Sequence, residues 1–253
     1  MQEITSVNNS LVKEVVKFQQ KKYRDSENKF LLEGKKCVEE AVSAGMNIDY
    51  IFILKEKLEQ YQEFKQFKDR LILTNEAVLK KISTTDSSPD IVGIAYKKQY
   101  SIKDIEKAKK VVLLENIKDL GNLGTILRSS TAFKADAVIL YGKECADVYN
   151  PKCVRSAVGN LWKIPIVYID NINDLQNQFS NFVRVATLPR AKDYLKDFCA
   201  EEPLLVMFGS EAEGLSDELV KFSTNQVKIE MAENVESLNL SVSCAIVLYE
   251  LFL

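Results

Sequence analysis

A series of short apolar runs in the second half of the chain constrains the fold more than any other feature. These runs are rich in Val, Ile and Leu, and stretches with helical periodicity separate them. Apolar runs that alternate with helices predict a mostly parallel sheet covered on both faces. The runs are VVLLENI, AVILYG, IPIVYI, VRVATL, LLVMFGS and QVKIEM. Because open parallel sheets bind ligands beyond the carboxyl ends of their strands, we expect function in the loops that follow these runs.

A smaller α/β module is predicted for residues 1–97, where helical and strand-like patterns also alternate. Its first helix has an apolar stripe, and a basic face at steps of three and four carries Lys13, Lys17, Lys21 and Arg24. A charged helix is expected over residues 55–67. The stretch KKQYSIKDIEKAKK lacks apolar periodicity, so we place a linker at 98–108 and a second domain at 109–253.

The composition excludes several classes of site. The chain of 253 residues has 34 basic and 36 acidic side chains, a net charge of −2, so no global basic field indicates a nucleic-acid partner. It has no histidine, which removes His-ligated metals and Ser-His triads. The five scattered cysteines form no CxxC pair, so we expect reduced, buried thiols and no metal site. With no signal-like N-terminus and no membrane-length apolar run, the sequence predicts a cytoplasmic protein without membrane association.

Three of the loops that follow strands have unusual compositions. KDLGNLGTILRSS has Gly121 and Gly124 at positions suited to tight turns, with Arg128 about one helical turn further on. GSEAEGLS, residues 209–216, places two carboxylates between glycines, and AENVESLNLS leads into an apolar terminal helix. Each also has an ordinary interpretation as a helix start, a surface loop or a helix cap. The glycine spacing matches neither a dinucleotide fingerprint nor a Walker loop.

In order and spacing, NLGTILR, GSEAEGLS and SLNLSVSCA resemble the three motifs of the SpoU/TrmH RNA 2'-O-ribose methyltransferases, in the SPOUT superfamily. RSAVGNLWKIPI also resembles this family, and residues 1–97 resemble, more loosely, the substrate-binding domain often fused in front. Two positions depart from the pattern. Leu120 stands where the family usually has Pro, and Pro89, Asp90 and Ile91 stand where Pro-Gln-Gly is common.

The resemblance implies an α/β fold with a deep trefoil knot, S-adenosylmethionine as methyl donor and a homodimer. By position, it places Gly209, Ile229 and Leu238 against the cofactor, with Thr187 a weaker candidate. It also assigns catalysis to Arg128, with support from a set of polar residues. Because a guanidinium stays protonated, we favour Arg128 as a clamp on phosphate and alkoxide over a base. The supporting residues are Asn122, Glu211, Ser237 and Asn239.

The polar candidates keep a second interpretation, since Glu211 could serve only to hold its loop and Asn239 only to cap a helix. Arg155 could contact RNA or form a surface ion pair. We therefore expect an RNA ribose 2'-O-methyltransferase that acts on ribosomal RNA, with transfer RNA possible. The alternatives are an RNA-binding module without catalysis and a nucleotide-dependent enzyme with an unknotted sheet.

Overall fold

The computed structural model describes residues 1–199 and 201–253, and the chain divides into two compact units. Unit 1 consists of residues 1–98 and 147–162, and unit 2 consists of residues 99–146 and 163–253. The segment 147–162 thus packs with the N-terminal residues, although it lies far along the chain from them. Each unit has its own sheet.

Unit 2 contains the parallel sheet that the apolar runs predict. It has seven strands in the order β10-β12-β9-β11-β6-β7-β8, and every neighbouring pair is parallel. All six predicted runs form strands, while the two-residue strand β10 at the edge was not predicted. The strands are β6 (Lys110–Glu115), β7 (Ala137–Tyr141), β8 (Ile166–Ile169), β9 (Val183–Thr187), β10 (Asp193–Tyr194), β11 (Leu204–Phe208) and β12 (Asn225–Lys228).

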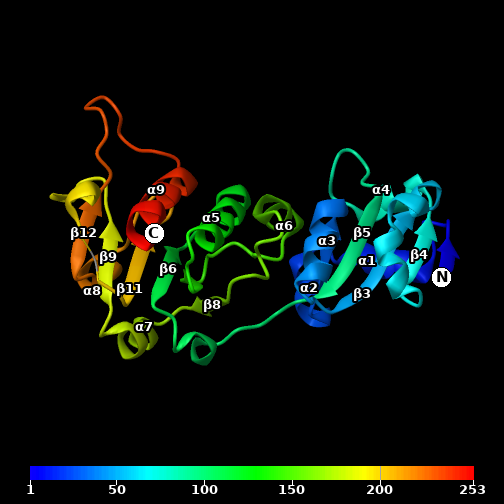
Figure 1. Ribbon diagram of the computed structural model, residues 1–253, viewed down its shortest axis with the longest axis horizontal. Helices are drawn as coiled ribbons and strands as arrows, with labels where there is room; N and C mark the ends of the chain where they lie inside the picture. Colours follow the sequence, from blue (N-terminus) through cyan, green and yellow to red (C-terminus); the bar gives the residue numbers. More distant parts are fainter. Residues whose placement is uncertain (200) are drawn as a thin grey trace. The chain divides into compact units, whose positions relative to one another are not determined.

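Helices cover both faces of this sheet, which explains the unbroken apolar runs of its central strands. Alternate strand residues such as Val111, Leu113 and Met207 form a core with Leu175, Phe179 and Leu219 of α7 and α8. Helices α5 and α9 contact each other on the other face (Figure 1). The helical elements are α5 (Leu120–Ala132), α7 (Ile172–Phe179), α8 (Asp217–Phe222), α9 (Leu240–Phe252), and the 3-10 helices η3 (Ile102–Ile105) and η4 (Leu195–Asp197).

The first glycine-containing motif lies in the first turns of helix α5, so its interpretation as a helix start is confirmed, and no separate tight turn precedes the helix among the described residues. The helix begins at Leu120, and the side chain of Asp119 accepts a hydrogen bond of 2.7 Å from the backbone N–H of Asn122. Asp119 is therefore the N-cap. Leu120 occupies the first helical position, where proline is favoured but not required, so the leucine leaves the helix start intact.

Unit 1 has a mixed five-stranded sheet in the order β1-β4-β3-β5-β2. Strands β1, β4 and β3 are parallel, and β5 is antiparallel to β3 and β2. Helices α1 and α4 bury Val12, Val15, Val78 and Leu79 on one face. The elements are β1 (Gln2–Ile4), α1 (Ser10–Lys17), α2 (Lys21–Glu27), β2 (Lys29–Glu33), α3 (Lys35–Ser43), β3 (Ile48–Leu54), η1 (Lys55–Gln60), η2 (Gln62–Phe67), β4 (Leu71–Thr74), α4 (Glu76–Ile82), β5 (Ile91–Tyr96) and α6 (Pro151–Ala157).

The predicted helix over residues 55–67 is wrong, because this stretch forms two 3-10 helices. Its larger apolar side chains, Leu58, Tyr61, Phe64 and Phe67, recur every three residues. That spacing places them on one side of a helix with three residues per turn. Tyr61 and Phe64 are buried there.

The predicted basic face is also revised, since α1 ends at Lys17 and a second helix, α2, begins at Lys21. Arg24 is 1% exposed and is therefore not a surface cation. Its Nη2 lies 2.6 Å from Asp147 Oδ2, and its Nη1 donates to the carbonyls of Phe18 and Gln19, both at 2.9 Å. One buried side chain thus caps the end of α1 and holds the segment 147–162.

Other contacts fix the same segment within unit 1. Arg155 on α6 pairs with the buried carboxylate of Glu33 and donates to the hydroxyl of Thr84 at 2.7 Å. The indole of Trp162 donates to the carbonyl of Glu40 at 3.2 Å. Arg155 was expected either to contact RNA or to form an ion pair, and the structure shows the ion pair.

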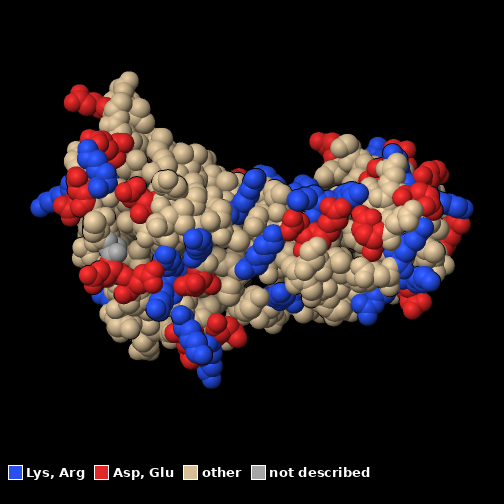
Figure 2. All heavy atoms as spheres, viewed as in Figure 1, with Lys and Arg blue, Asp and Glu red and all other residues tan. Residues whose placement is uncertain are grey.

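The surface and the cysteines bear on the expectations from composition. Basic and acidic side chains intermix on the face drawn in Figure 2. All five cysteines are free, but Cys199 is exposed and Cys145 half-buried, so the expectation of buried thiols holds for Cys37, Cys153 and Cys244. Across the described ranges, no helix is both long and apolar enough to traverse a bilayer.

We expect Asp147→Ala to destabilise unit 1 by about 3 to 5 kcal/mol, because it leaves the buried charge of Arg24 without its partner. The single tryptophan, Trp162, lies in unit 1, so its fluorescence during denaturant unfolding reports on this unit. Asp69→Ala is the control, since Asp69 is exposed. Equal unfolding midpoints for the two variants would contradict the role given to this ion pair.

Candidate active site

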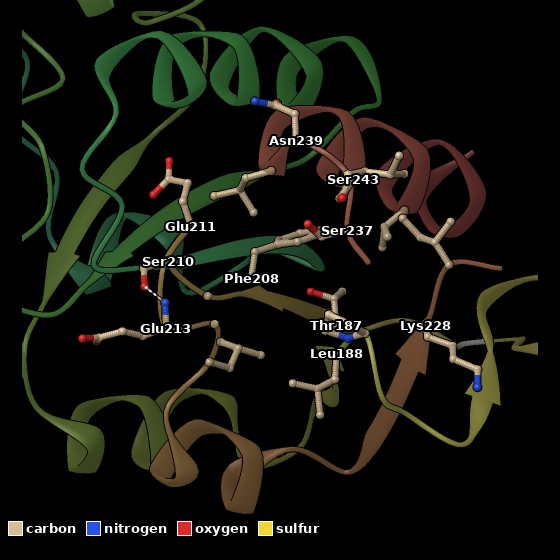
Figure 3. A pocket seen from close by; sticks show the side chains of 18 of the residues that line it. Thr187, Leu188, Phe208, Ser210, Glu211, Glu213, Lys228, Ser237, Asn239 and Ser243 are labelled. Carbon is tan, nitrogen blue, oxygen red and sulfur yellow. Dashed lines mark hydrogen bonds between the residues drawn. The ribbon is translucent and has the colours of Figure 1, made fainter. Parts of the chain in front are cut away.

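A pocket of about 600 Å³ lies at the carboxyl ends of β9, β11 and β12, in the size range of small-molecule sites. Three chain segments form most of it: the loop after β11, the residues after β12 and the start of α9 (Figure 3). The lining includes Thr187, Leu188, Phe208, Gly209, Glu211, Val227, Ile229, Met231, Ser237, Leu238, Asn239, Ser243 and Val247.

All four predicted cofactor residues line this pocket: Thr187, Gly209, Ile229 and Leu238. The hydroxyl of Thr187 donates to the carbonyl of Met207 at 2.9 Å, so its proton is already engaged within the sheet. The sequence analysis missed the apolar residues beside them, Phe208, Val227 and Val247, which are nearly fully buried. Their position in the sequence could have indicated them, since Phe208 is the last residue of its strand and therefore lies at the edge where ligands bind.

Gly209 marks a close approach of two stretches of backbone. A methyl group at this position would overlap main-chain atoms of Gly214 and Leu215. Ser210 and Gly214 exchange backbone hydrogen bonds of 3.1 and 3.0 Å, and the N–H of Glu213 donates to Ser210 Oγ. The loop 210–214 therefore closes on itself, which requires a residue without a side chain at its entrance.

A directed chain of hydrogen bonds joins the three motifs. Asn239 is the N-cap of α9, and its Oδ1 accepts from the N–H and the hydroxyl of Ser241 at 2.9 and 2.6 Å. The amide group of Asn239 must therefore point away from the helix, and it donates to Asn122 Oδ1 at 3.1 Å. The amide group of Asn122 in turn donates to Glu211 Oε1 at 3.0 Å. The cap at the start of α9 thus fixes the donor-to-acceptor direction of these hydrogen bonds. Glu211 is the final acceptor.

The remaining candidates lie apart from this network. Ser237 lines the pocket, with its side chain toward the cavity in Figure 3. Arg128 is exposed on α5, is absent from the pocket lining and has no ion pair within the described part of the chain. The structure therefore brings Asn122, Glu211 and Asn239 together, whereas Arg128 lies outside this hydrogen-bond network.

Two part-buried hydrogen bonds hold the far end of the loop 209–216 and the helix α8 that follows it. The carboxylate of Glu115, at the end of β6, accepts from the backbone N–H of Ser216 at 2.7 Å. The hydroxyl of Tyr141 donates to Glu218 at 2.7 Å. Burial, and then this hydrogen bond, raise the pKa of Tyr141, so the hydroxyl keeps its proton as a donor. The sequence analysis missed Glu115, although a carboxylate inside an apolar run signals a buried acceptor.

A parallel α/β sheet with a partly backbone-lined pocket at its carboxyl edge defines an enzyme-like ligand-binding domain. The chain belongs to the SpoU rRNA Methylase family, whose model matches residues 109–249. A second model, the MRM3-like substrate binding domain, matches residues 9–93. Both matches agree with the family resemblances seen in the sequence motifs.

Relatives and solved structures resemble the chain over nearly its full length. An uncharacterized tRNA/rRNA methyltransferase of Synechocystis sp. is 31% identical, with 98% of this chain and 92% of that protein covered. The 23S rRNA (guanosine(2553)-2'-O)-methyltransferase RlmP of Bacillus subtilis is 28% identical, with 99% of both chains covered. The crystal structure of an AdoMet-bound rRNA methyltransferase from Sinorhizobium meliloti superimposes with a TM-score of 0.88 at 30% identity, covering 98% of this chain and 96% of that one.

Asn239→Asp separates the capping role of Asn239 from its role in the network. A carboxylate still accepts from Ser241, so we expect the free energy of unfolding to stay within about 0.5 kcal/mol of the parent, whereas Asn239→Ala loses about 1 kcal/mol. Methyl transfer should fall in both variants, because neither donates to Asn122. Chemical denaturation and a methylation assay test this pair. Full activity of Asn239→Asp would contradict the polarity assigned to the network.

Proposed function

We propose that this protein is an S-adenosylmethionine-dependent RNA ribose 2'-O-methyltransferase that acts on ribosomal RNA. The observation that carries the proposal is the pocket at the carboxyl edge of the parallel sheet, bordered by the Asn239–Asn122–Glu211 chain. Membership of the SpoU family and the activities for which its relatives are named support the reaction and the RNA class. The AdoMet-bound structure from Sinorhizobium meliloti supports the cofactor.

The residues of the pocket fit S-adenosylmethionine. Buried apolar side chains such as Phe208 and Val247 suit an adenine ring and a methionine chain. Gly209 lets main-chain atoms come close, as polar recognition by N–H and C=O groups requires. The bound cofactor supplies a methyl group on a sulfonium, whose carbon–sulfur bond breaks as the bond to the ribose oxygen forms. We propose that the surrounding chain, residues 209–240, takes the knotted path that the family resemblance implies.

The side chains must then align a ribose 2'-hydroxyl and stabilise the charge that develops as it loses its proton. Arg128 is exposed and has no ion pair among the described residues, so its donors are available to a phosphate and to the developing alkoxide. Its guanidinium does not accept a proton, and the proton passes to water or to an RNA phosphate. Glu211 and Asn122, held in fixed orientation, border the place where the ribose must lie.

We expect Arg128→Ala to lower turnover by about 100-fold or more, as the loss of an electrostatic donor does elsewhere, with S-adenosylmethionine affinity unchanged. Methylation of ribosomal RNA by radiolabelled cofactor gives the first quantity, and titration calorimetry gives the second. Arg190→Ala, another exposed arginine, is the control and should keep its turnover. Near-parental turnover of Arg128→Ala would contradict the assigned role.

The two family matches support a division of labour along the chain. We propose that residues 1–97 bind the RNA substrate, that 98–108 link the two parts and that 109–253 carry out methyl transfer. Transfer RNA is the second candidate substrate, because the Synechocystis relative is named for both RNA classes. Mass mapping of ribose methylation in both RNA classes, from cells with and without the gene, distinguishes them.

We also propose a homodimer formed through helix α9. The apolar terminal helix buries Cys244, Val247, Leu248 and Phe252 but leaves other apolar residues exposed. An apolar stripe at helical spacing on the surface fits a partner chain. The exposed residues and their exposures are Val242 47%, Ile246 39%, Tyr249 61% and Leu253 64%. The free thiols fit a reducing compartment, and we propose the cytoplasm.

Ile246→Lys should convert the dimer to a monomer, because it places a charge in the centre of this stripe. Size-exclusion chromatography with light scattering gives the molar mass. Val7→Lys, at an exposed apolar residue of unit 1, should leave the mass of a dimer unchanged. A monomeric parent protein, or a dimeric Ile246→Lys variant, would refute the proposed interface.

A further inference from the structure

We propose that unit 1 binds RNA phosphates through a lysine surface at the adjoining ends of α1, α2 and α4. We define this lysine surface as Lys13, Lys17, Lys22, Lys80 and Lys81. The inference rests on the proposed function, which makes RNA the substrate, and goes beyond it by assigning the residues. It also differs from the basic face predicted from sequence, which included Lys21 and Arg24.

Two of the three helices of this surface, α1 and α4, are brought together by packing and by one glutamine. Helices α1 and α4 contact each other on the same face of the unit 1 sheet. Gln19, just after α1, donates through Nε2 to the carbonyls of Lys81, Ile82 and Ser83 at 3.2, 3.2 and 3.1 Å. The C-terminal ends of α1 and α4 therefore meet. All five lysines of the surface are exposed.

The lysines of this surface form none of the ion pairs that most other lysines of unit 1 form in the described part of the chain. No ion pair within 4.0 Å involves any of the five in the described ranges of the chain. Glu14 on α1 and Glu76 on α4 lie one helical turn from Lys17 and Lys80, but neither carboxylate forms an ion pair with them in the described part of the chain. The lysines of unit 1 that do form ion pairs are Lys21, Lys29, Lys35, Lys36, Lys55, Lys57, Lys65 and Lys97.

Tyr23 holds two of these cations near each other without neutralising them. The Nζ atoms of Lys17 and Lys22 lie 5.6 and 5.8 Å from the centre of its ring. The negative face of an aromatic ring attracts ammonium groups, but it leaves their full charge available. Lys13 and Lys17 are also one helical turn apart, where like charges destabilise a helix. This repulsion is relieved when an anion binds between the lysines.

A nucleic-acid backbone supplies such anions in a row. Lysine binds phosphate as a point charge, and phosphate contacts of this kind carry no sequence information. The lysine surface would thus provide affinity and hold the RNA on unit 1, while the choice of nucleotide resides elsewhere. We assign one phosphate to the pair Lys17 and Lys22, with the other lysines along the same backbone.

The test compares the double variant Lys17→Gln, Lys22→Gln with the control Lys55→Gln, Lys65→Gln, which removes two ion-paired lysines of the same unit. RNA affinity is measured over a salt series by fluorescence anisotropy with a labelled, unmodified ribosomal RNA transcript. We expect the test variant to bind about tenfold more weakly, and its slope of log affinity against log salt to flatten by about 0.7 to 0.9 per lost phosphate contact. The control should match the parent.

Tyr23 offers a second, independent comparison. Tyr23→Phe keeps the ring and should preserve affinity and salt slope, whereas Tyr23→Leu keeps apolar bulk but removes the ring, and should weaken binding. Thermal unfolding of each variant verifies folding. Equal salt slopes for the test and control double variants would overturn the lysine surface, as would equal RNA affinity of Tyr23→Leu and Tyr23→Phe. Loss of the proposed function would look different, because the parent would then fail to bind S-adenosylmethionine in calorimetry.

Discussion

The close approach of backbone at Gly209 is the constraint on which the site depends. Because no side chain separates Gly209 from Gly214, the loop after β11 folds back on itself and leaves main-chain atoms beside the pocket. Glu115 and Tyr141 hold the other end of this loop through Ser216 and Glu218, so its shape is fixed from two sides. A pocket built this way offers a ligand main-chain N–H and C=O groups as well as side chains.

Polar side chains then connect this loop to the other two motifs. The cap of α9 fixes the orientation of Asn239, and the orientation passes through Asn122 to Glu211. The same Asn239 side chain therefore caps α9 through its oxygen and orients Asn122 through its amide group. In unit 1, Arg24 likewise has two structural roles, since it caps the end of α1 and holds the segment 147–162.

Strand-length apolar runs made the parallel sheet predictable, and the family resemblance of the three motifs supplied the candidates that line the pocket. What failed were local features decided by tertiary contacts. Arg24 looked like a surface cation because helical spacing cannot reveal that Asp147, distant in sequence, buries it. Ile246 and Tyr249 are exposed on the apolar terminal helix, and apolarity alone does not tell a core face from an exposed one. The stretch 55–67 was predicted as one charged helix, whereas its three-residue apolar repeat suits the two 3-10 helices that it forms.

The central claim is that three separate segments, the loop after β11, the residues after β12 and the start of α9, jointly enclose S-adenosylmethionine. Hydrogen–deuterium exchange of the full chain, with and without saturating cofactor, tests it most directly. The account predicts slower exchange in residues 209–215, 229–231 and 237–240 together, with unit 1 unaffected. Cofactor binding that leaves those three segments unprotected, or no binding at all, would contradict it.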